Sequence, residues 1–147
     1  MYRYSGYLLY RKQLCVYRFA AFGRFFRERL STSMMNLFLL LLIKHSLIDL
    51  WLQSYHRGSR KDLYWGGHRH YAEHAAGTLA VCAVFVDPLG AVAAALFDWL
   101  CHWHIDHTKT LCVRNWSRSQ PRYWFAQSID QILHYLTYWA VAVVLLG

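Results

Sequence analysis

The apolar residues of this chain fall into four long stretches separated by shorter polar or basic connections. The stretches cover residues 34–53, 68–86, 89–111 and 122–146. None of them shows the strict alternation of apolar and polar positions that a half-buried strand requires, so the pattern predicts helices. Between the second and third stretches lies Asp87-Pro88, where proline cannot continue a helical hydrogen-bond ladder but suits the first turn of a new helix. The chain is therefore predicted to be all-α.

The length and composition of these stretches favour a membrane. At about 1.5 Å per residue, helices of roughly 17–25 residues can cross a hydrocarbon layer of about 30 Å. The composition is 56% hydrophobic and 18% aromatic, which is more apolar surface than a soluble domain of 147 residues normally needs for its core. Tryptophan and tyrosine at this density suit the headgroup level of a bilayer. We predict a four-helix transmembrane bundle over residues 34–147, antiparallel and connected up-down-up-down.

Residues 1–33 are a separate basic and aromatic segment. Arginines interrupt its apolar residues too often for a membrane span, and the pattern is typical of an amphipathic helix lying in the membrane interface. A second interpretation is that the natural chain begins at Met34 or Met35 and that the segment is a mis-assigned extension. The pattern leaves both interpretations open.

The net charge of +8 arises from 16 Lys and Arg against 8 Asp and Glu. The basic residues lie in the flanks between apolar stretches and not along one helix, so we predict a lipid bilayer as the partner and no nucleic acid. The connections 54–69 and 107–122 each carry four Lys or Arg, and residues 1–33 carry seven. If the chain begins at Met34 or Met35, the positive-inside rule places both connections in the cytoplasm.

Histidine and aspartate recur at a spacing of four in every predicted helix. The pairs are His45/Asp49, His70/His74, His102/Asp106 and Asp130/His134. This spacing puts both side chains of a pair on one helix face, which is how helix bundles supply inward-facing metal ligands. The pairs lie late in the first and third predicted helices and early in the second and fourth. In an antiparallel bundle, all four pairs are therefore expected to lie at the same depth. The alternative for each pair is a His–Asp hydrogen bond that satisfies two buried polar groups.

The donor atoms predict a divalent metal site without thiolate. Imidazole nitrogen and carboxylate oxygen suit Zn, Mn or Fe, and the four cysteines show no metal-binding spacing. Eight candidate ligands exceed one tetrahedral site, which favours two ions that activate water and clamp an ester or phosphoester oxygen. Three further residues are candidates for catalysis: Asp98 as an additional acid, Glu73 as a general base if it turns inward, and Lys109 as a group that holds an anion.

The segments 45–53, 70–74, 102–109 and 130–134 carry a resemblance to a known family. Their sequences HSLIDLWLQ, HYAEH, HWHIDHTK and DQILH resemble the small phage and bacterial membrane proteins known as domain of unknown function 3307, over about residues 35–146. The resemblance implies an integral protein of a bacterial inner membrane and brings no established activity. Its pattern is similar to that of membrane-bound metal-dependent hydrolases.

Three functions are compatible with these features. The first is a membrane metal-dependent hydrolase of a lipid-linked or phosphoester substrate, with its site on the cytoplasmic side. The second is a di-iron membrane redox protein, since membrane desaturases also use histidine pairs. The third is a non-enzymatic membrane protein encoded by a phage, or a proton or metal conduit, because buried His and Asp chains also carry protons.

Overall fold

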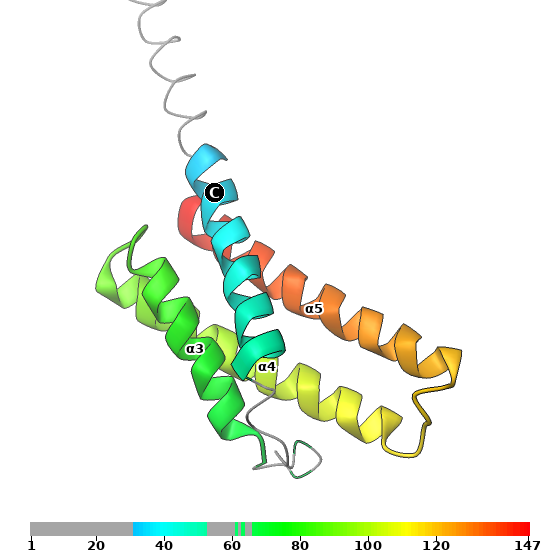
Figure 1. Cartoon of the computed structure of the whole chain (residues 1–147). Helices are drawn as coiled ribbons and strands as arrows, with labels where there is room; N and C mark the ends of the chain where they lie inside the picture. Colours follow the sequence, from blue (N-terminus) through cyan, green and yellow to red (C-terminus); the bar gives the residue numbers. More distant parts are fainter. Residues whose placement is uncertain (1–30, 53–60, 62, 64–65) are drawn as a thin grey trace, which may run out of the picture.

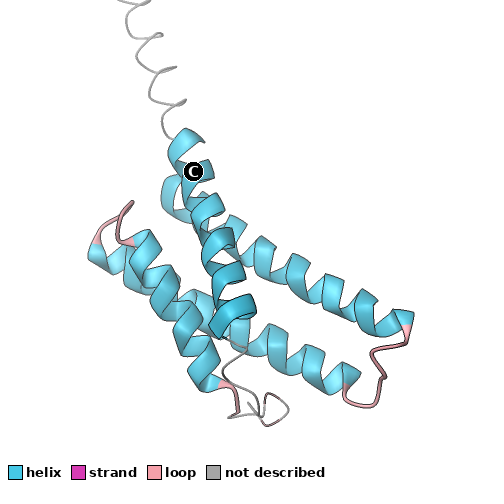
Figure 2. Cartoon of the chain, viewed as in Figure 1, coloured by secondary structure: helices cyan, strands magenta, loops and turns pink. Residues whose placement is uncertain are grey.

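The structure is a computed structural model that describes residues 31–52, 61, 63 and 66–147 (Figure 1). Every regular element in the described ranges is a helix (Figure 2). A first helix covers residues 31–47 and continues as the π-helix η1 (Ile48–Leu52). It is followed by α3 (His68–Cys82), α4 (Pro88–Val113) and α5 (Pro121–Leu146). The all-α prediction is confirmed, while the predicted N-terminal segment lies outside the described residues except for 31–33, which begin the first helix.

Consecutive helices run in opposite directions, as the sequence predicts (Figure 1). In the described residues α4 is the central helix, because it packs against α3 on one side and against α5 on the other. The C-terminal end of α5 lies near the start of the first helix. On the side of the α4–α5 connection, α4 and α5 extend beyond the other helices, so the bundle is open at that end.

The turn between α3 and α4 forms four residues earlier than the sequence pattern suggests. The second helix was expected to reach Val86, but α3 ends at Cys82. From there Val84 and Phe85 bond to carbonyls three residues back, and this tighter geometry ends the α-helix. The side chain of Asp87 then caps α4 by accepting from two backbone amides of its first turn, and Pro88 occupies the first helical position.

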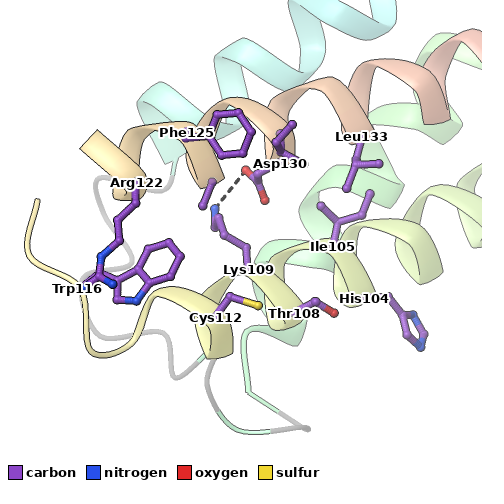
Figure 3. A pocket seen from close by; sticks show the side chains of 12 residues that line it. His104, Ile105, Thr108, Lys109, Cys112, Trp116, Arg122, Phe125, Asp130 and Leu133 are labelled. Atoms are coloured by element: carbon purple, nitrogen blue, oxygen red, sulfur yellow. Dashed lines mark hydrogen bonds and ion pairs between the residues drawn. The ribbon is translucent and has the colours of Figure 1, made fainter. Parts of the chain in front are cut away.

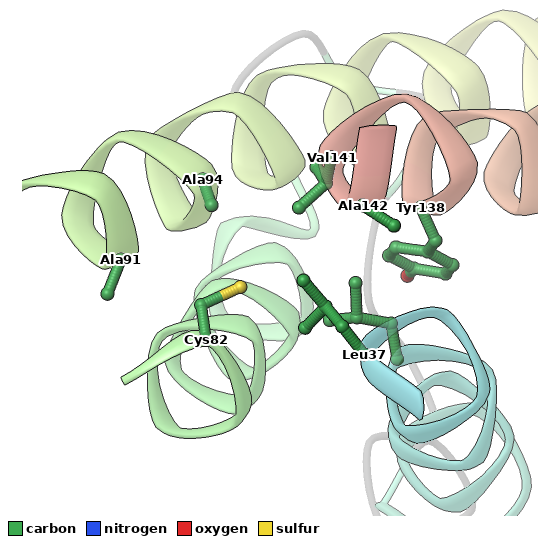
Figure 4. Packing of buried hydrophobic residues seen from close by; sticks show 8 residues of the cluster. Leu37, Cys82, Ala91, Ala94, Tyr138, Val141 and Ala142 are labelled. Atoms are coloured by element: carbon green, nitrogen blue, oxygen red, sulfur yellow. The ribbon is translucent and has the colours of Figure 1, made fainter. Parts of the chain in front are cut away.

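A purely apolar core fills the end of the bundle that contains this turn. It is built from all four helices and consists of Leu37, Leu41, Cys82, Ala91, Ala94, Tyr138, Val141 and Ala142 (Figure 4). Alanines on α4 and α5 let the helix backbones approach closely, which is the packing that helices in a lipid environment favour. The core aligns the helices so that their polar residues meet in the other half of the bundle.

The prediction that all four helices span a bilayer is not supported. Among the described residues, α5 is the helix that is long and apolar enough to cross a membrane. At about 1.5 Å per residue, α3 with its 15 residues is shorter than a hydrocarbon layer of about 30 Å. The first helix and α4 carry charged residues in their interiors, including Lys44 and Asp98. These charged residues make the first helix and α4 less apolar than a membrane-spanning helix normally is.

The outer surface of the bundle is nevertheless strongly apolar. Around the end that holds the apolar core, Val144, Leu89 and Val84 are 82%, 79% and 77% exposed. Exposed leucines, phenylalanines and tryptophans continue along the outer faces of α4 and α5 beside the polar half. Soluble monomers rarely expose contiguous apolar patches of this kind, and such patches mark contact with a membrane or a partner. The surface therefore indicates contact with a membrane or with a partner.

Candidate metal centre

The four predicted pairs meet in the polar half of the bundle. His45 and Asp49 come from the first helix and η1, and the other pairs come from α3, α4 and α5. Seven of the eight side chains are buried, with His74 and His102 at 0% exposure. Asp49 is the exception, because 21% of its side chain reaches the surface. The structure brings the predicted residues together, and Asp49 is the most exposed of them.

One group of these residues has the composition of a tetrahedral metal site. Ligand atoms of His45, Asp49, His74 and His102 all lie within 4.8 Å of one another. The Asp49 carboxylate is 3.1 Å from Nε2 of His74 and 3.3 Å from Nε2 of His45. Three imidazoles and one carboxylate form a donor set that a zinc-type ion prefers. Because the four residues come from three helices, their convergence depends on the tertiary fold.

A π-helical turn carries the one carboxylate of this group. The first helix widens at Ile48, one residue before Asp49, to form η1. Short π-helical turns inside α-helices are rare and occur frequently at functional sites. Here the widened turn lies where the Asp49 carboxylate meets His45, His70 and His74.

Two further groups adjoin the first and share residues with each other. One contains His70, His102 and Asp106, and the other contains Asp106, Asp130 and His134. His102 belongs to the first and second groups, and Asp106 belongs to the second and third. A shared ligand can bridge two adjacent ions, so the arrangement has the connectivity of a two-ion centre.

Lysines balance the charge of the third group. Lys61 forms an ion pair with Asp106, and Lys109 Nζ lies 3.0 Å from Asp130 and 3.5 Å from Asp106. An ammonium group at these carboxylates supplies the positive charge that a metal ion would otherwise bring. The group of His45, Asp49, His74 and His102 offers four ligand atoms, one more than either of the other two groups, and we therefore regard it as the primary site.

The buried histidines leave polar atoms without partners. The ring of His102 stacks between those of His74 and His134, with centroid separations of 3.7 and 3.9 Å. Within the described residues, neither ring nitrogen of His102 has a hydrogen-bond partner, and the same holds for His74 Nδ1. A buried unsatisfied polar atom costs about 1–3 kcal/mol, so native structures rarely keep several of them together. Coordination of an ion would satisfy these nitrogens, so the residues present fit a metal ion.

Lys44 forms a second polar network directly beside the primary site. Its Nζ donates to Asp98 at 2.9 Å, to the Tyr138 hydroxyl at 3.1 Å and to the backbone carbonyl of His74 at 3.3 Å. Thr78 donates to the same Asp98 oxygen at 2.5 Å, and the Tyr138 hydroxyl lies 3.1 Å from Nδ1 of His45. The network connects a buried ion pair to one of the proposed ligands.

The three residues predicted for catalysis occupy different places. Asp98 is 1% exposed and pairs with Lys44, and its second oxygen lies 3.8 Å from Nδ1 of His102, close enough for electrostatic attraction but too far for a hydrogen bond. Lys109 faces the carboxylates of the third group. Glu73 belongs to none of the three groups found in the described residues, and its carboxylate lies 3.3 Å from Nε of the exposed Arg69, so its role as a general base stays a prediction.

Sequence reasoning did not assign a role to Lys44, Lys61, Thr78 or Tyr138. The spacing of four that marks the pairs would have indicated two of them, because Thr78 follows His74 by one turn and Tyr138 follows His134 by one turn. Lys44 is a lone charge at the end of an apolar run, which is a signal of a buried functional group. Gln131 supports His45 by a hydrogen bond, since its Oε1 lies 3.2 Å from Nε2 of that residue.

The comparisons with known proteins identify a family. Residues 37–146 match the family described as "Protein of unknown function (DUF3307)", and the chain belongs to this family. The matched range begins in the first helix and ends with α5, and it contains every residue of the three groups. No curated protein matches the chain, and no solved structure does.

Proposed function

We propose that this member of the family is an integral membrane metalloprotein that holds a divalent ion on His45, Asp49, His74 and His102. The observation that carries the proposal is the buried convergence of three imidazoles and one carboxylate with unsatisfied ring nitrogens. Zn, Mn and Fe suit these donors. None of the groups in the described residues includes a cysteine, and Cys82 packs in the apolar core instead.

The exposed apolar surface supports insertion in a bilayer. It surrounds both the apolar core and the polar half, and among the described helices α5 is long and apolar enough to cross. In this arrangement the helices together shield the polar centre from lipid, as intramembrane ionisable residues require. Arg114 and Arg118 lie in the α4–α5 connection, on the side of the polar half, so the positive-inside rule favours a cytoplasmic position for the centre.

We infer that the reaction is hydrolysis of an ester or phosphoester at the membrane surface. A divalent ion at such a site would polarise the scissile oxygen and lower the pKa of a bound water. Asp49 and the three histidines would hold that ion, and Asp98 would keep the His102 ring in place. Lys109, next to the shared carboxylate Asp106, would attract the negative charge of a phosphoester. The second group offers a place for a second ion through His102 and Asp106.

Elemental analysis of detergent-purified protein tests the proposal. We expect about one or two equivalents of Zn, Mn or Fe per chain. His102→Ala should remove most of the metal because this residue belongs to two of the groups. The matched control is His104→Ala on the same helix, whose exposed ring bonds only to the Leu100 carbonyl in the described structure, and it should keep the metal. Equal metal contents in both variants would contradict the proposal.

The network around Lys44 favours a second candidate function, a proton conduit. Lys44, the Tyr138 hydroxyl and His45 form a continuous chain of hydrogen-bonding groups through the buried bundle. Chains of titratable groups in membrane proteins carry protons. A folded protein that binds no metal would favour this function over hydrolysis.

A further inference from the structure

The open end of the bundle contains a groove between the last turns of α4 and the first turns of α5. Its volume is about 550 Å³, within the roughly 300–1,000 Å³ that small-molecule sites occupy. Ile105, Phe125, Ala126, Ile129 and Leu133 form apolar walls (Figure 3). The groove exists because α4 and α5 extend past the other helices, which therefore do not cover it.

The inner side of this α4–α5 groove reaches the third group of candidate ligands. Lys109 and Asp130 both line it and form an ion pair of 3.0 Å across it (Figure 3). Asp130 also belongs to the third group of candidate ligands, together with Asp106 and His134. A molecule in the groove would thus contact the same residues as an ion in that part of the centre.

A cation marks the outer end of the groove. Arg122 stacks on the Trp116 ring at 4.8 Å, and both residues line the groove beside the α4–α5 connection (Figure 3). In the described structure its polar contact is with the Gln120 amide oxygen at 3.0 Å, and no carboxylate neutralises it there. Arginine in this situation is suited to bind a phosphate group. Trp116 and the exposed Trp124 at the same level are typical of a membrane interface.

We propose that the α4–α5 groove binds a phosphate-bearing lipid of the surrounding leaflet as the substrate. Its phosphate would lie between Arg122 and Lys109, and its hydrocarbon chain would follow Phe125, Ile129 and Leu133 toward the apolar half of the bundle. This direction matches that of a lipid in a bilayer, with its head at the interface and its chain toward the centre. The inference names the substrate class for the proposed hydrolase and rests on that function for the reaction, but not for the binding.

Two pairs of variants isolate the groove. Ala126→Phe fills it, and Ile132→Phe adds similar bulk at an exposed position on α5 that does not line it. Arg122→Gln removes the cation at the outer end, and Arg118→Gln removes a nearby exposed cation that lies outside the groove. The two phenylalanine variants test where the hydrocarbon chain of the lipid binds, and the two glutamine variants test where its phosphate binds.

The experiment measures binding of dodecyl phosphate carrying a brominated chain to the full-length protein in neutral detergent, through quenching of tryptophan fluorescence. Brominated dodecanol and inorganic phosphate are the comparison ligands. We expect the phosphate ester to bind at least tenfold more tightly than the alcohol. The reason is that a charge-assisted hydrogen bond between the phosphate and Arg122 increases affinity by about a factor of ten. Arg122→Gln should remove this preference, and Ala126→Phe should abolish binding of the ester. Ile132→Phe and Arg118→Gln should bind as the unchanged protein does.

Three results would overturn the inference. The first is equal binding to Ala126→Phe and Ile132→Phe, the second is equal affinity for ester and alcohol, and the third is inorganic phosphate binding as tightly as the ester. Metal content is measured on the same samples. Groove-dependent binding by protein without metal would support the inference and contradict the proposed hydrolase, whereas metal without groove-dependent binding would do the reverse.

Discussion

Lys44 is the residue whose surroundings are most unusual in this bundle. It is a 7% exposed ammonium group that directly follows a run of leucine and isoleucine in the first helix. Removing a charge from water is costly, and the cost is repaid only when hydrogen bonds and a counter-charge satisfy the group. Asp98, Tyr138 and the His74 carbonyl provide these contacts, so Lys44 joins the first helix to α3, α4 and α5. The residue therefore stabilises the polar half of the bundle around the proposed metal ligands.

Replacing Lys44 with methionine should destabilise the protein by about 3–5 kcal/mol. The reason is that Asp98 would keep its buried charge and lose its counter-ion at 2.9 Å. The double variant Lys44→Met/Asp98→Asn should recover a large part of this loss because no uncompensated charge remains. Thermal unfolding of the detergent-purified proteins in a double-mutant cycle measures the coupling. Additive effects of the two substitutions would show that the ion pair contributes nothing.

At the scale of the helices, the sequence predicted most of what the structure contains. The Asp87-Pro88 signal located the turn before α4, and Pro121 lies at the start of α5. The spacing of four predicted which histidines and aspartates share a helix face, and the antiparallel order predicted that they meet. These features depend on local geometry or on connection order, which a sequence pattern records directly.

Contacts between helices could not be predicted in the same way. The spacing of four fixes a face but not the distance to a neighbouring helix, so it did not show that Lys61 reaches Asp106 or that Lys109 reaches Asp130 on α5. The opening between α4 and α5 depends on the relative lengths and angles of helices, and no residue pattern encodes it directly.

Gly77 on α3 makes room for the Lys44 side chain. A methyl group at this position would come within 2.7 Å of Lys44 Cδ and Cγ and 3.1 Å of Ile48 Cδ1. Because hydrogen bonds hold the Lys44 ammonium in place, its stem cannot move away freely. Gly77→Ala should therefore cost about 1–3 kcal/mol through overpacking, although alanine favours helices more than glycine does.

Gly90→Ala is the control for this prediction. Its added methyl group would lie 3.3 Å from a methyl of Val86 at the start of α4, a contact that a small adjustment relieves. Thermal unfolding of both variants decides between the effects. If Gly77→Ala is as stable as Gly90→Ala, the close approach of the first helix and α3 is not what holds Lys44.

On the scale of the whole molecule, the bundle combines a polar interior with an apolar exterior. The polar half of the bundle buries five histidines and three aspartates. They are His45, His70, His74, His102, His134, Asp98, Asp106 and Asp130. The outer faces carry exposed leucine, valine, isoleucine and aromatic side chains. A soluble protein has the opposite arrangement, since burial of polar groups is costly and exposure of apolar patches promotes association. The arrangement supports the proposed membrane location.

Substituting aspartate for Val144 tests whether lipid surrounds the bundle. In water, a charge at a position that is 82% exposed should change stability by less than about 0.5 kcal/mol. In a bilayer a charge costs up to about 2.5–3.5 kcal/mol at the centre of a helix and less toward its end, where Val144 lies, so the variant should be retained less well in the membrane fraction. The measurement is the amount of protein that resists alkaline extraction of membranes. Arg118→Asp in the connection is the control, and equal retention of both variants would contradict an apolar surrounding at Val144.

The central claim is that His45, Asp49, His74 and His102 coordinate a metal ion, and X-ray absorption at the metal edge of the purified protein tests it most directly. The account predicts three imidazole nitrogens and one carboxylate oxygen at about 2.0–2.2 Å, with outer-shell scattering from the histidine rings that His102→Ala reduces and His104→Ala preserves. A spectrum with only oxygen ligands and no imidazole contribution, or protein without any metal edge after reconstitution, would contradict the account.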